Sequence, residues 1–233
     1  MFTVNKSDSR GRTNIDWLNS YHSFSFGDYF NNKKMSFGPI RVLNEDFIAP
    51  GGGFPLHPHA NMEIITYVIS GELAHSDSTG NNETIKAGEF QKMTAGSGVY
   101  HSEFNPSSKD EVHLLQIWIL PDTKGLTPSY GTLNLQGNYL NNNLLKVAAK
   151  EESDNLIYVS QNIEVFVSKF DADFSHNLVG KEKKGIYLFL IDGELSINDN
   201  LIATGDSIEI AGETNIEIEA NKKSHFILFE FPL

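Results

Sequence analysis

EIITYVISGEL, residues 63–73, combines a run of six β-branched or aromatic residues with a tight turn at Gly71. A stretch of the same design, GIYLFLIDGEL, spans residues 185–195. Runs of β-branched and aromatic residues of this length, closed by glycine turns, are typical of buried β-strands. The chain therefore repeats one β unit, and each copy contains an apolar strand that ends in a Gly-Glu-Leu turn.

The same order of turns extends beyond both copies. Two more glycine turns follow in each, at residues 88 and 96 and at residues 205 and 212. Strand-like runs recur elsewhere and helical periodicity is scarce, which predicts an all-β protein built as a sandwich or barrel. The join is expected within residues 121–143, which are rich in Pro, Gly and Asn. We therefore predict domains at residues 1–130 and 131–233.

The composition limits the chemistry and the partners of the chain. None of the 233 residues is a cysteine, so disulfides and thiolate metal sites are excluded and any metal must have nitrogen and oxygen ligands. The net charge of −12 disfavours direct binding of nucleic acid. No apolar run approaches the roughly 18 residues of a membrane span, and residues 1–17 lack the apolar region of a secretory signal. We expect a cytoplasmic protein that does not enter a membrane.

Two short motifs carry the candidate chemistry. His57-Pro58-His59 and His101-Ser102-Glu103 are separated by 41 residues. Residues i and i+2 of a strand face the same side, so each motif projects a pair of side chains together. On neighbouring strands of a barrel, the two pairs would converge. Three imidazoles and a carboxylate suit a divalent metal with open positions, although either motif alone would be better explained by surface histidines or by a histidine bonded to a backbone carbonyl.

The context of these motifs resembles the two motifs of the cupin superfamily and, more closely, the pirin family. The resembling segments are Arg10-Gly11, Trp17-Leu18, His22-Ser23-Phe24-Ser25-Phe26-Gly27, Arg41-Val42-Leu43-Asn44, Pro50-Gly51-Gly52-Gly53-Phe54, His57-Pro58-His59, Met62-Glu63-Ile64, Thr94-Ala95-Gly96 and His101-Ser102-Glu103. They cover roughly residues 10–131, and the rest of the chain resembles the family in its strand pattern alone. The resemblance implies two double-stranded β-helix (jelly-roll, cupin) domains packed in one chain.

The resemblance also implies a ligand set for a non-haem iron in the amino-terminal domain. The family's four ligands fall on His57, His59, His101 and Glu103. In many other cupins the carboxylate at the position of Glu63 is the ligand instead. We expect Glu103 to be the ligand, which leaves Glu63 as a catalytic acid–base residue or as a hydrogen-bonded carboxylate that orients a ligand histidine.

The second copy lacks imidazoles at the corresponding positions. When the spacings of the metal motifs are counted from the glycine turns of the second copy, the four equivalent positions are Val179, Lys181, Glu217 and Glu219. The neighbouring His176 is expected to be an exposed loop residue. We therefore predict a carboxy-terminal cupin domain without metal ligands, which packs against the first domain or shapes its entrance.

The remaining histidines carry weaker signals. His75 and His113 have no partner at ligand spacing. His22 lies in the aromatic segment 21–26, where it either covers the core or forms a wall of the metal pocket.

The resemblance implies a function as well. Members of the pirin family are associated with quercetin 2,3-dioxygenase activity, which opens a flavonol ring with loss of carbon monoxide. The expected partners are thus one Fe(II) ion, a small aromatic substrate and O₂, with Mn, Ni, Cu and Zn as alternative metals. Mammalian pirins are transcriptional co-regulators, so the alternative is a metal-dependent regulatory bicupin with a protein partner and no physiological turnover. We expect a monomer.

Overall fold

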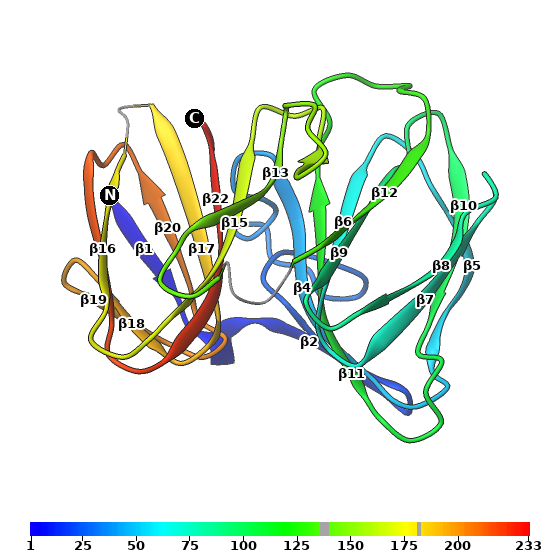
Figure 1. The fold of residues 1–233 in the computed structure, drawn as a ribbon, viewed down its shortest axis with the longest axis horizontal. Helices are drawn as coiled ribbons and strands as arrows, with labels where there is room; N and C mark the ends of the chain where they lie inside the picture. Colours follow the sequence, from blue (N-terminus) through cyan, green and yellow to red (C-terminus); the bar gives the residue numbers. More distant parts are fainter. Residues whose placement is uncertain (136–139, 181–182) are drawn as a thin grey trace. The chain divides into compact units, whose positions relative to one another are not determined.

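The structure is a computed structural model that describes residues 1–135, 140–180 and 183–233. It consists almost entirely of β-strands (Figure 1) and divides into two compact units. The first unit comprises residues 11–136 and 159–161, and the second comprises residues 1–10, 137–158 and 162–233. Each unit contains one seven-stranded sheet and one four-stranded sheet. This architecture confirms the predicted all-β class with two jelly-roll domains.

All strands of the first unit pair in antiparallel fashion. They are β2 (Gly11–Ile15), β3 (Leu18–His22), β4 (Ile40–Ile48), β5 (Gly53–His59), β6 (Glu63–Ser70), β7 (Glu72–Asp77), β8 (Asn82–Lys86), β9 (Glu89–Thr94), β10 (Val99–Phe104), β11 (Val112–Ile119) and β12 (Ser129–Asn134). The larger sheet has the order β12-β9-β6-β11-β4-β3-β2, and the smaller has the order β5-β10-β7-β8.

The second unit repeats the two-sheet arrangement with the remaining elements. They are β1 (Phe2–Asn5), a 3₁₀ turn η1 (Ser7–Ser9), β13 (Leu145–Ala149), β14 (Ile157–Tyr158), β15 (Glu164–Phe170), β16 (Ser175–Val179), β17 (Lys184–Asp192), β18 (Glu194–Ile197), β19 (Asn200–Ala203), β20 (Ser207–Ala211), β21 (Asn215–Ala220) and β22 (Ser224–Pro232). The larger sheet has the order β1-β20-β17-β22-β15-β13-β14, and the smaller has the order β16-β21-β18-β19.

The two Gly-Glu-Leu turns occupy equivalent places in these sheets. Gly71 joins β6 to β7 with a φ of 80°, and Gly193 joins β17 to β18 with a φ of 105°. A Cβ on Gly71 would lie 2.9 Å from the carbonyl oxygen of Glu111, and one on Gly193 would lie 2.5 Å from that of Lys223. Both positive φ and close backbone approach favour glycine, which explains why the turn recurs in each copy.

The compact units depart from the expected division at residue 130 in three places. Strand β1, from the start of the chain, pairs with β20 and thus belongs to the second unit (Figure 1). Strand β12 continues to Asn134 and pairs with β9, so the first unit extends past residue 130. Residues 159–161 return to the first unit, where Gln161 Nε2 donates to the carbonyl oxygen of Leu120 at 2.8 Å.

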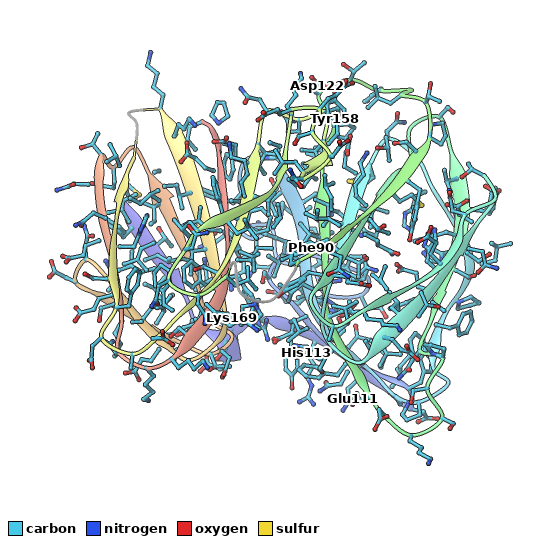
Figure 2. The ribbon with its side chains drawn as sticks, viewed as in Figure 1. Phe90, Glu111, His113, Asp122, Tyr158 and Lys169 are labelled. Carbon is cyan, nitrogen blue, oxygen red and sulfur yellow. The ribbon has the colours of Figure 1, made fainter. Side chains whose placement is uncertain are left out.

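Apolar side chains fill the interior of each unit. In the second unit, Leu188, Ile208 and Phe226 belong to one cluster of buried residues. In the first unit, Phe90 (Figure 2) and Tyr67 are fully buried and stack with ring centroids 4.1 Å apart. Within the described ranges, no helix has the length and apolar character needed to cross a bilayer.

Candidate metal centre

Pairing between β5 and β10 brings the two histidine motifs together. His101 lies directly opposite His57, and Val99 lies opposite His59. Along β10 the buried residues Val99, His101 and Glu103 alternate with outward-facing ones, as the i, i+2 pattern predicts. At the other end of the pair, a Cβ on Gly53 would lie 2.3 Å from the carbonyl oxygen of Glu103, so the close approach of the strands requires glycine there.

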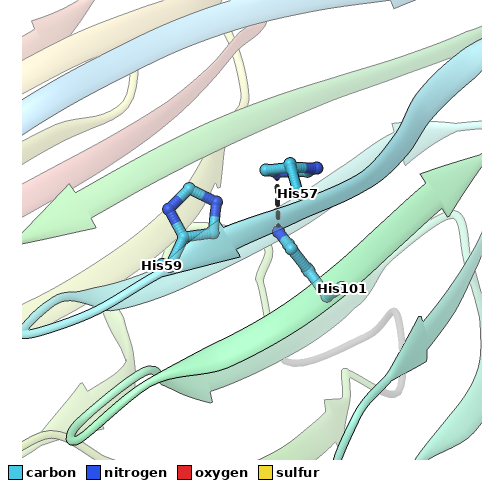
Figure 3. A group of neighbouring side chains, drawn as sticks. All are labelled: His57, His59 and His101. Atoms are coloured by element: carbon cyan, nitrogen blue, oxygen red, sulfur yellow. Dashed lines mark hydrogen bonds between the residues drawn. The ribbon is translucent and has the colours of Figure 1, made fainter.

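The imidazoles of His57, His59 and His101 converge as predicted (Figure 3). One ligand nitrogen from each lies within 4.8 Å of the others. The Nε2 atoms of His57 and His101 are 3.0 Å apart. His59 completes the group, with its ring centroid 4.8 Å from that of His57 and 4.9 Å from that of His101.

The environment keeps the rings of His59 and His101 neutral. Burial, followed by the neighbouring imidazole of His57, lowers the pKa of His59 to about 4 and that of His101 to about 3. His57 donates its Nδ1–H to the carbonyl oxygen of Pro55 at 2.8 Å, an assignment that follows because a carbonyl only accepts. Its Nε2 therefore carries a lone pair directed at the other two imidazoles. Neutral imidazole is the form that ligates metals.

Glu103 is fully enclosed and held by side-chain donors. Gln91 Nε2 donates to its Oε1 at 2.6 Å, Gln116 Nε2 donates to its Oε2, and Thr66 Oγ1 lies 3.4 Å from Oε1. The amide of Gln91 is itself oriented, because its Oε1 accepts from the hydroxyl of Tyr130 at 3.1 Å. Burial raises the pKa of Glu103 to about 7, although these donors favour the ionised form.

The structure also groups Glu103 with a histidine that the sequence analysis left aside. His75, on β7, lies opposite Glu103 of β10. One ligand atom each from His75, His101 and Glu103 lies within 4.8 Å of the others. Two overlapping triads thus share His101, one with His57 and His59 and one with His75 and Glu103. The available signal for His75 was Asp77 at i+2, whose Oδ2 lies 3.1 Å from His75 Nε2.

This donor set fits a divalent cation. Neutral imidazoles and a buried carboxylate are the nitrogen and oxygen ligands that borderline divalent metals prefer. In addition, the Nδ1 atoms of His75 and His101 are buried and have no hydrogen-bond partner. Buried polar atoms are rarely left unpaired in proteins without a reason such as an ion or a functional role. The residues of this centre could therefore hold a metal ion.

A cavity of about 290 Å³ is lined by His57, His59 and His101. Its apolar wall includes Phe26, Phe54 and Trp118. The indole of Trp118 meets the ring of His59 edge-on, with centroids 4.9 Å apart. The volume is close to the lower end of the roughly 300–1,000 Å³ typical of small-molecule pockets.

Other residues that line the cavity are polar. His22 contributes through β3, where its Nδ1 lies 2.8 Å from Asn44 Oδ1 and its Nε2 lies 2.9 Å from Thr13 Oγ1. Asp46 accepts a short hydrogen bond from Ser20 Oγ. His22 is thus both buried and part of the pocket wall, the functional alternative raised by the sequence. Asp46 belongs to no motif by which the sequence could have identified it as a pocket residue.

Glu63 lies elsewhere in the same unit. Its side chain is fully buried, with Oε1 accepting from the backbone N–H of Ser160 at 3.1 Å. Its Oε2 lies 3.5 Å from Thr94 Oγ1 and 3.6 Å from the ammonium nitrogen of Lys92. Among the described residues, Glu63 is absent from the cavity lining and from both ligand triads. Its catalytic role remains a prediction to which this geometry adds no support.

Among the described residues, the other histidines and the second copy contribute to neither ligand triad. His113 (Figure 2) stacks on Phe47 and contacts Glu45, and His176 is a half-buried residue of β16 instead of a loop residue. At the positions equivalent to the metal motifs, Val179 is 75% exposed and both Glu217 and Glu219 face outward from β21. Lys181 lies outside the described residues.

Comparisons with known proteins place this architecture in a family. The sequence profile described as Pirin matches residues 3–119, and that described as Quercetinase C-terminal cupin domain matches residues 146–231. A Pasteurella multocida protein is 40% identical over 99% of both chains. The quercetin 2,3-dioxygenase of Escherichia coli K12 is 38% identical over 100% of this chain and 99% of its own. The similarity therefore extends well beyond residue 131.

Solved structures agree with these matches. The crystal structure of YhhW from Escherichia coli is 37% identical and superposes with a TM-score of 0.96, covering 100% of this chain and 98% of that one. A second structure, of the bacterial pirin YhhW in complex with nickel(II), has a TM-score of 0.94 at 37% identity, covering 100% and 99%. With two cupin units, a cluster of three histidines and matches along nearly its whole length, the chain belongs to the pirin family.

Proposed function

We propose that this chain is a metal-dependent dioxygenase that cleaves a flavonol such as quercetin with O₂ at a mononuclear centre. The observation that carries the proposal is the convergence of His57, His59 and His101 at one wall of a cavity with aromatic sides. The name of the Escherichia coli relative supports it. Fe(II) is the proposed metal, and Ni, Mn, Cu and Zn remain chemically compatible with the same ligands.

The cavity supplies complementary surfaces for a planar polyphenol. Phe26, Phe54 and Trp118 offer ring faces and edges against which an aromatic ring system can pack. His22 and Asp46 provide polar atoms for phenolic hydroxyls. This combination of apolar rings and a few polar groups is typical of small-molecule pockets.

The reaction requires the flavonol hydroxyl to lose a proton. Glu103, the fourth proposed ligand, is also positioned to accept it, because its buried carboxylate lines the cavity and shares a ligand group with His101. Gln91 and Gln116 fix the orientation of the carboxylate through their amide donors. A bound divalent ion would supply Lewis-acid polarisation of the substrate oxygen and a template for substrate and O₂.

Anaerobic loading with Fe(II), followed by quercetin and then O₂, tests the proposal. We expect loss of the flavonol absorption and release of carbon monoxide with the loaded chain, and neither with the His57→Ala/His101→Ala variant. Equal turnover by that variant would show that the reaction does not use this centre. Tight, metal-dependent quercetin binding without turnover would contradict the enzyme and favour the regulatory alternative.

A further inference from the structure

Five polar side chains from β2, β3 and β4 line the cavity in addition to its aromatic residues. They are Thr13, Ser20, His22, Asn44 and Asp46. All but Thr13 are buried. Buried polar groups are costly unless each finds a hydrogen-bond partner, so the pattern of donors and acceptors in this set indicates what the cavity is built to receive.

Each polar cavity residue of β4 is held by its neighbour on β3. Strand pairing sets Ser20 opposite Asp46 and His22 opposite Asn44. Ser20 Oγ donates a short hydrogen bond to Asp46 Oδ1, and Asn44 Oδ1 lies 2.8 Å from His22 Nδ1. These bonds orient both side chains of β4 in the absence of a ligand, so a ligand meets preorganised groups.

The same bonds decide which atoms are left for a ligand. The amide oxygen of Asn44 only accepts, so His22 donates from Nδ1, and Thr13 Oγ1 donates to His22 Nε2 at 2.9 Å. Asn44 Nδ2 then carries two N–H donors, and the structure pairs this atom with no described residue. Asp46 is an acceptor, and a carboxylate offers about four acceptor positions, of which Ser20 takes one.

Asn44 and Asp46 therefore present a donor and an acceptor on one face of β4. At positions i and i+2 of a strand they face the same way, with Cα atoms roughly 6.6 Å apart. Asn44 also lies opposite Gln116 of β11, whose amide donates to Glu103. The donor–acceptor pair is thus one strand away from a residue that holds the proposed carboxylate ligand.

A vicinal dihydroxyphenyl (catechol) ring is complementary to this pair. One of its hydroxyls donates to the other, so the ring presents one O–H donor and one oxygen acceptor outward. We propose that Asn44 and Asp46 recognise a catechol ring of the substrate, with Asp46 accepting from one hydroxyl and Asn44 Nδ2 donating to the other. The rings of Phe26 and Trp118 in the same lining favour an aromatic diol over a sugar diol.

This inference rests on the proposed function, because it names the substrate class of the same cavity: flavonols with two adjacent hydroxyls. Quercetin has a catechol ring, and kaempferol lacks one hydroxyl of that ring. A ring with one hydroxyl leaves a buried donor or acceptor without a partner, and sites built to bind a hydroxyl reject analogues that lack it. We expect the Kd of kaempferol to exceed that of quercetin at least about tenfold.

Anaerobic binding of the two flavonols to the Zn²⁺-loaded full chain, followed by their absorption, tests the proposal. Asp46→Asn keeps the size of the side chain but replaces an acceptor with a donor, so the ratio of the two Kd values should fall below about threefold. The ratio is internal to each sample, so partial unfolding of a variant does not change it. Asp110→Asn, the same exchange at an exposed position outside the cavity lining, should keep the original ratio. A ratio near one in the unaltered chain, or an unchanged ratio in Asp46→Asn, would overturn the proposal.

A crystal structure of the Zn²⁺-loaded chain with quercetin locates the ring directly. We expect one catechol oxygen within about 3.0 Å of the Asp46 carboxylate and the other within about 3.2 Å of Asn44 Nδ2. A catechol ring directed away from β4 would contradict the inference. Neither measurement requires turnover. Cleavage of both flavonols with equal affinities would refute this inference alone, and selective binding by a chain that never cleaves quercetin would refute the proposed function alone.

Discussion

The Nε2 atoms of His57 and His101 lie 3.0 Å apart across the β5–β10 pair, although 44 positions separate the residues in the chain. Because His101 belongs to both triads and His57 to one, replacing His101 should weaken metal binding more than replacing His57. His101→Ala is expected to lower Co²⁺ or Ni²⁺ affinity by more than the roughly 10–100-fold that loss of an outer partner costs. His57→Ala should have a smaller effect. Calorimetric titration measures both.

His113→Ala is the matched control for these two variants. This histidine is on β11 of the same unit, where it contacts Glu45 and Phe47 instead of the centre. Metal affinity should be unchanged by its loss. A larger loss of affinity in His57→Ala than in His101→Ala would contradict the shared-ligand geometry.

Trp118 should control substrate binding more than metal binding. Its indole lines the cavity and packs edge-on against both His59 and Phe26, with centroids 4.9 and 5.4 Å away. Trp118→Ala is expected to raise the KM for quercetin about tenfold, corresponding to roughly 1.4 kcal/mol of lost contact. Trp118→Phe, which keeps a ring, should recover most of this loss. Steady-state kinetics at matched metal content would check it, and a KM equal to that of the unaltered chain in Trp118→Ala would place the substrate elsewhere.

Glu63→Gln separates the predicted acid–base role from a structural one. The carboxylate contacts Lys92, Thr94 and Ser160, and burial lowers the pKa of Lys92 against the opposing effect of Glu63. Removing one partner of a buried ion pair costs about 3–5 kcal/mol, so we expect a large loss of unfolding free energy with metal content unchanged. Turnover per folded, metal-loaded chain should be within a few-fold of that of the unaltered chain.

The double variant Glu63→Gln/Lys92→Met is the control for this interpretation. It removes both charges and should recover part of the lost stability, which a double-mutant cycle quantifies. If Glu63 instead served as the general base, turnover of the single variant would fall by roughly 10²–10⁴-fold with little change in unfolding.

Local patterns predicted which side chains share a strand face in the histidine cluster. The i, i+2 spacing of His57 with His59 and of His101 with Glu103 correctly placed each pair on one face of a strand. The spacing could not reveal that the register of the strand pair shifts between His101 and Glu103. Because of this shift, Glu103 pairs with Phe54 of β5. Such irregularities depend on the pairing of strands and have no signature within one strand.

The sequence alone does not identify residues whose position depends on pairing between strands that are distant in the chain. His75 joins the centre because β7 pairs with β10 and sets it opposite Glu103. Strand β1 pairs with β20 some 200 residues away, so no local pattern could assign it to the second unit. The two repeated turns, by contrast, were visible because each requires a glycine with positive φ at a fixed place in its hairpin.

The free energy of unfolding should depend on pH through Asp206, whose carboxylate accepts hydrogen bonds from the amino-terminal segment. Burial alone would raise the pKa of Asp206, but hydrogen bonds from Lys6, Ala203 and Ser7 outweigh it and hold the pKa below its ordinary value. The Lys6 ammonium lies 2.8 Å from Oδ2, and the Ser7 backbone nitrogen lies 2.7 Å from Oδ1. Asp206 thereby fastens the residues that follow β1.

A carboxyl with a depressed folded-state pKa stabilises the fold above its unfolded value of about 3.9 and loses that contribution as the pH falls through the folded value. Asp206→Asn should therefore lower the unfolding free energy at pH 7 by about 1–3 kcal/mol, and the difference from the unaltered chain should shrink near pH 3. Urea unfolding of the metal-free chain at the two pH values measures this. Asp8→Asn, at an exposed position of η1, should change the free energy by less than about 0.5 kcal/mol. A gap for Asp206→Asn that is equally large at both pH values would mean that the carboxylate charge does not stabilise this anchor.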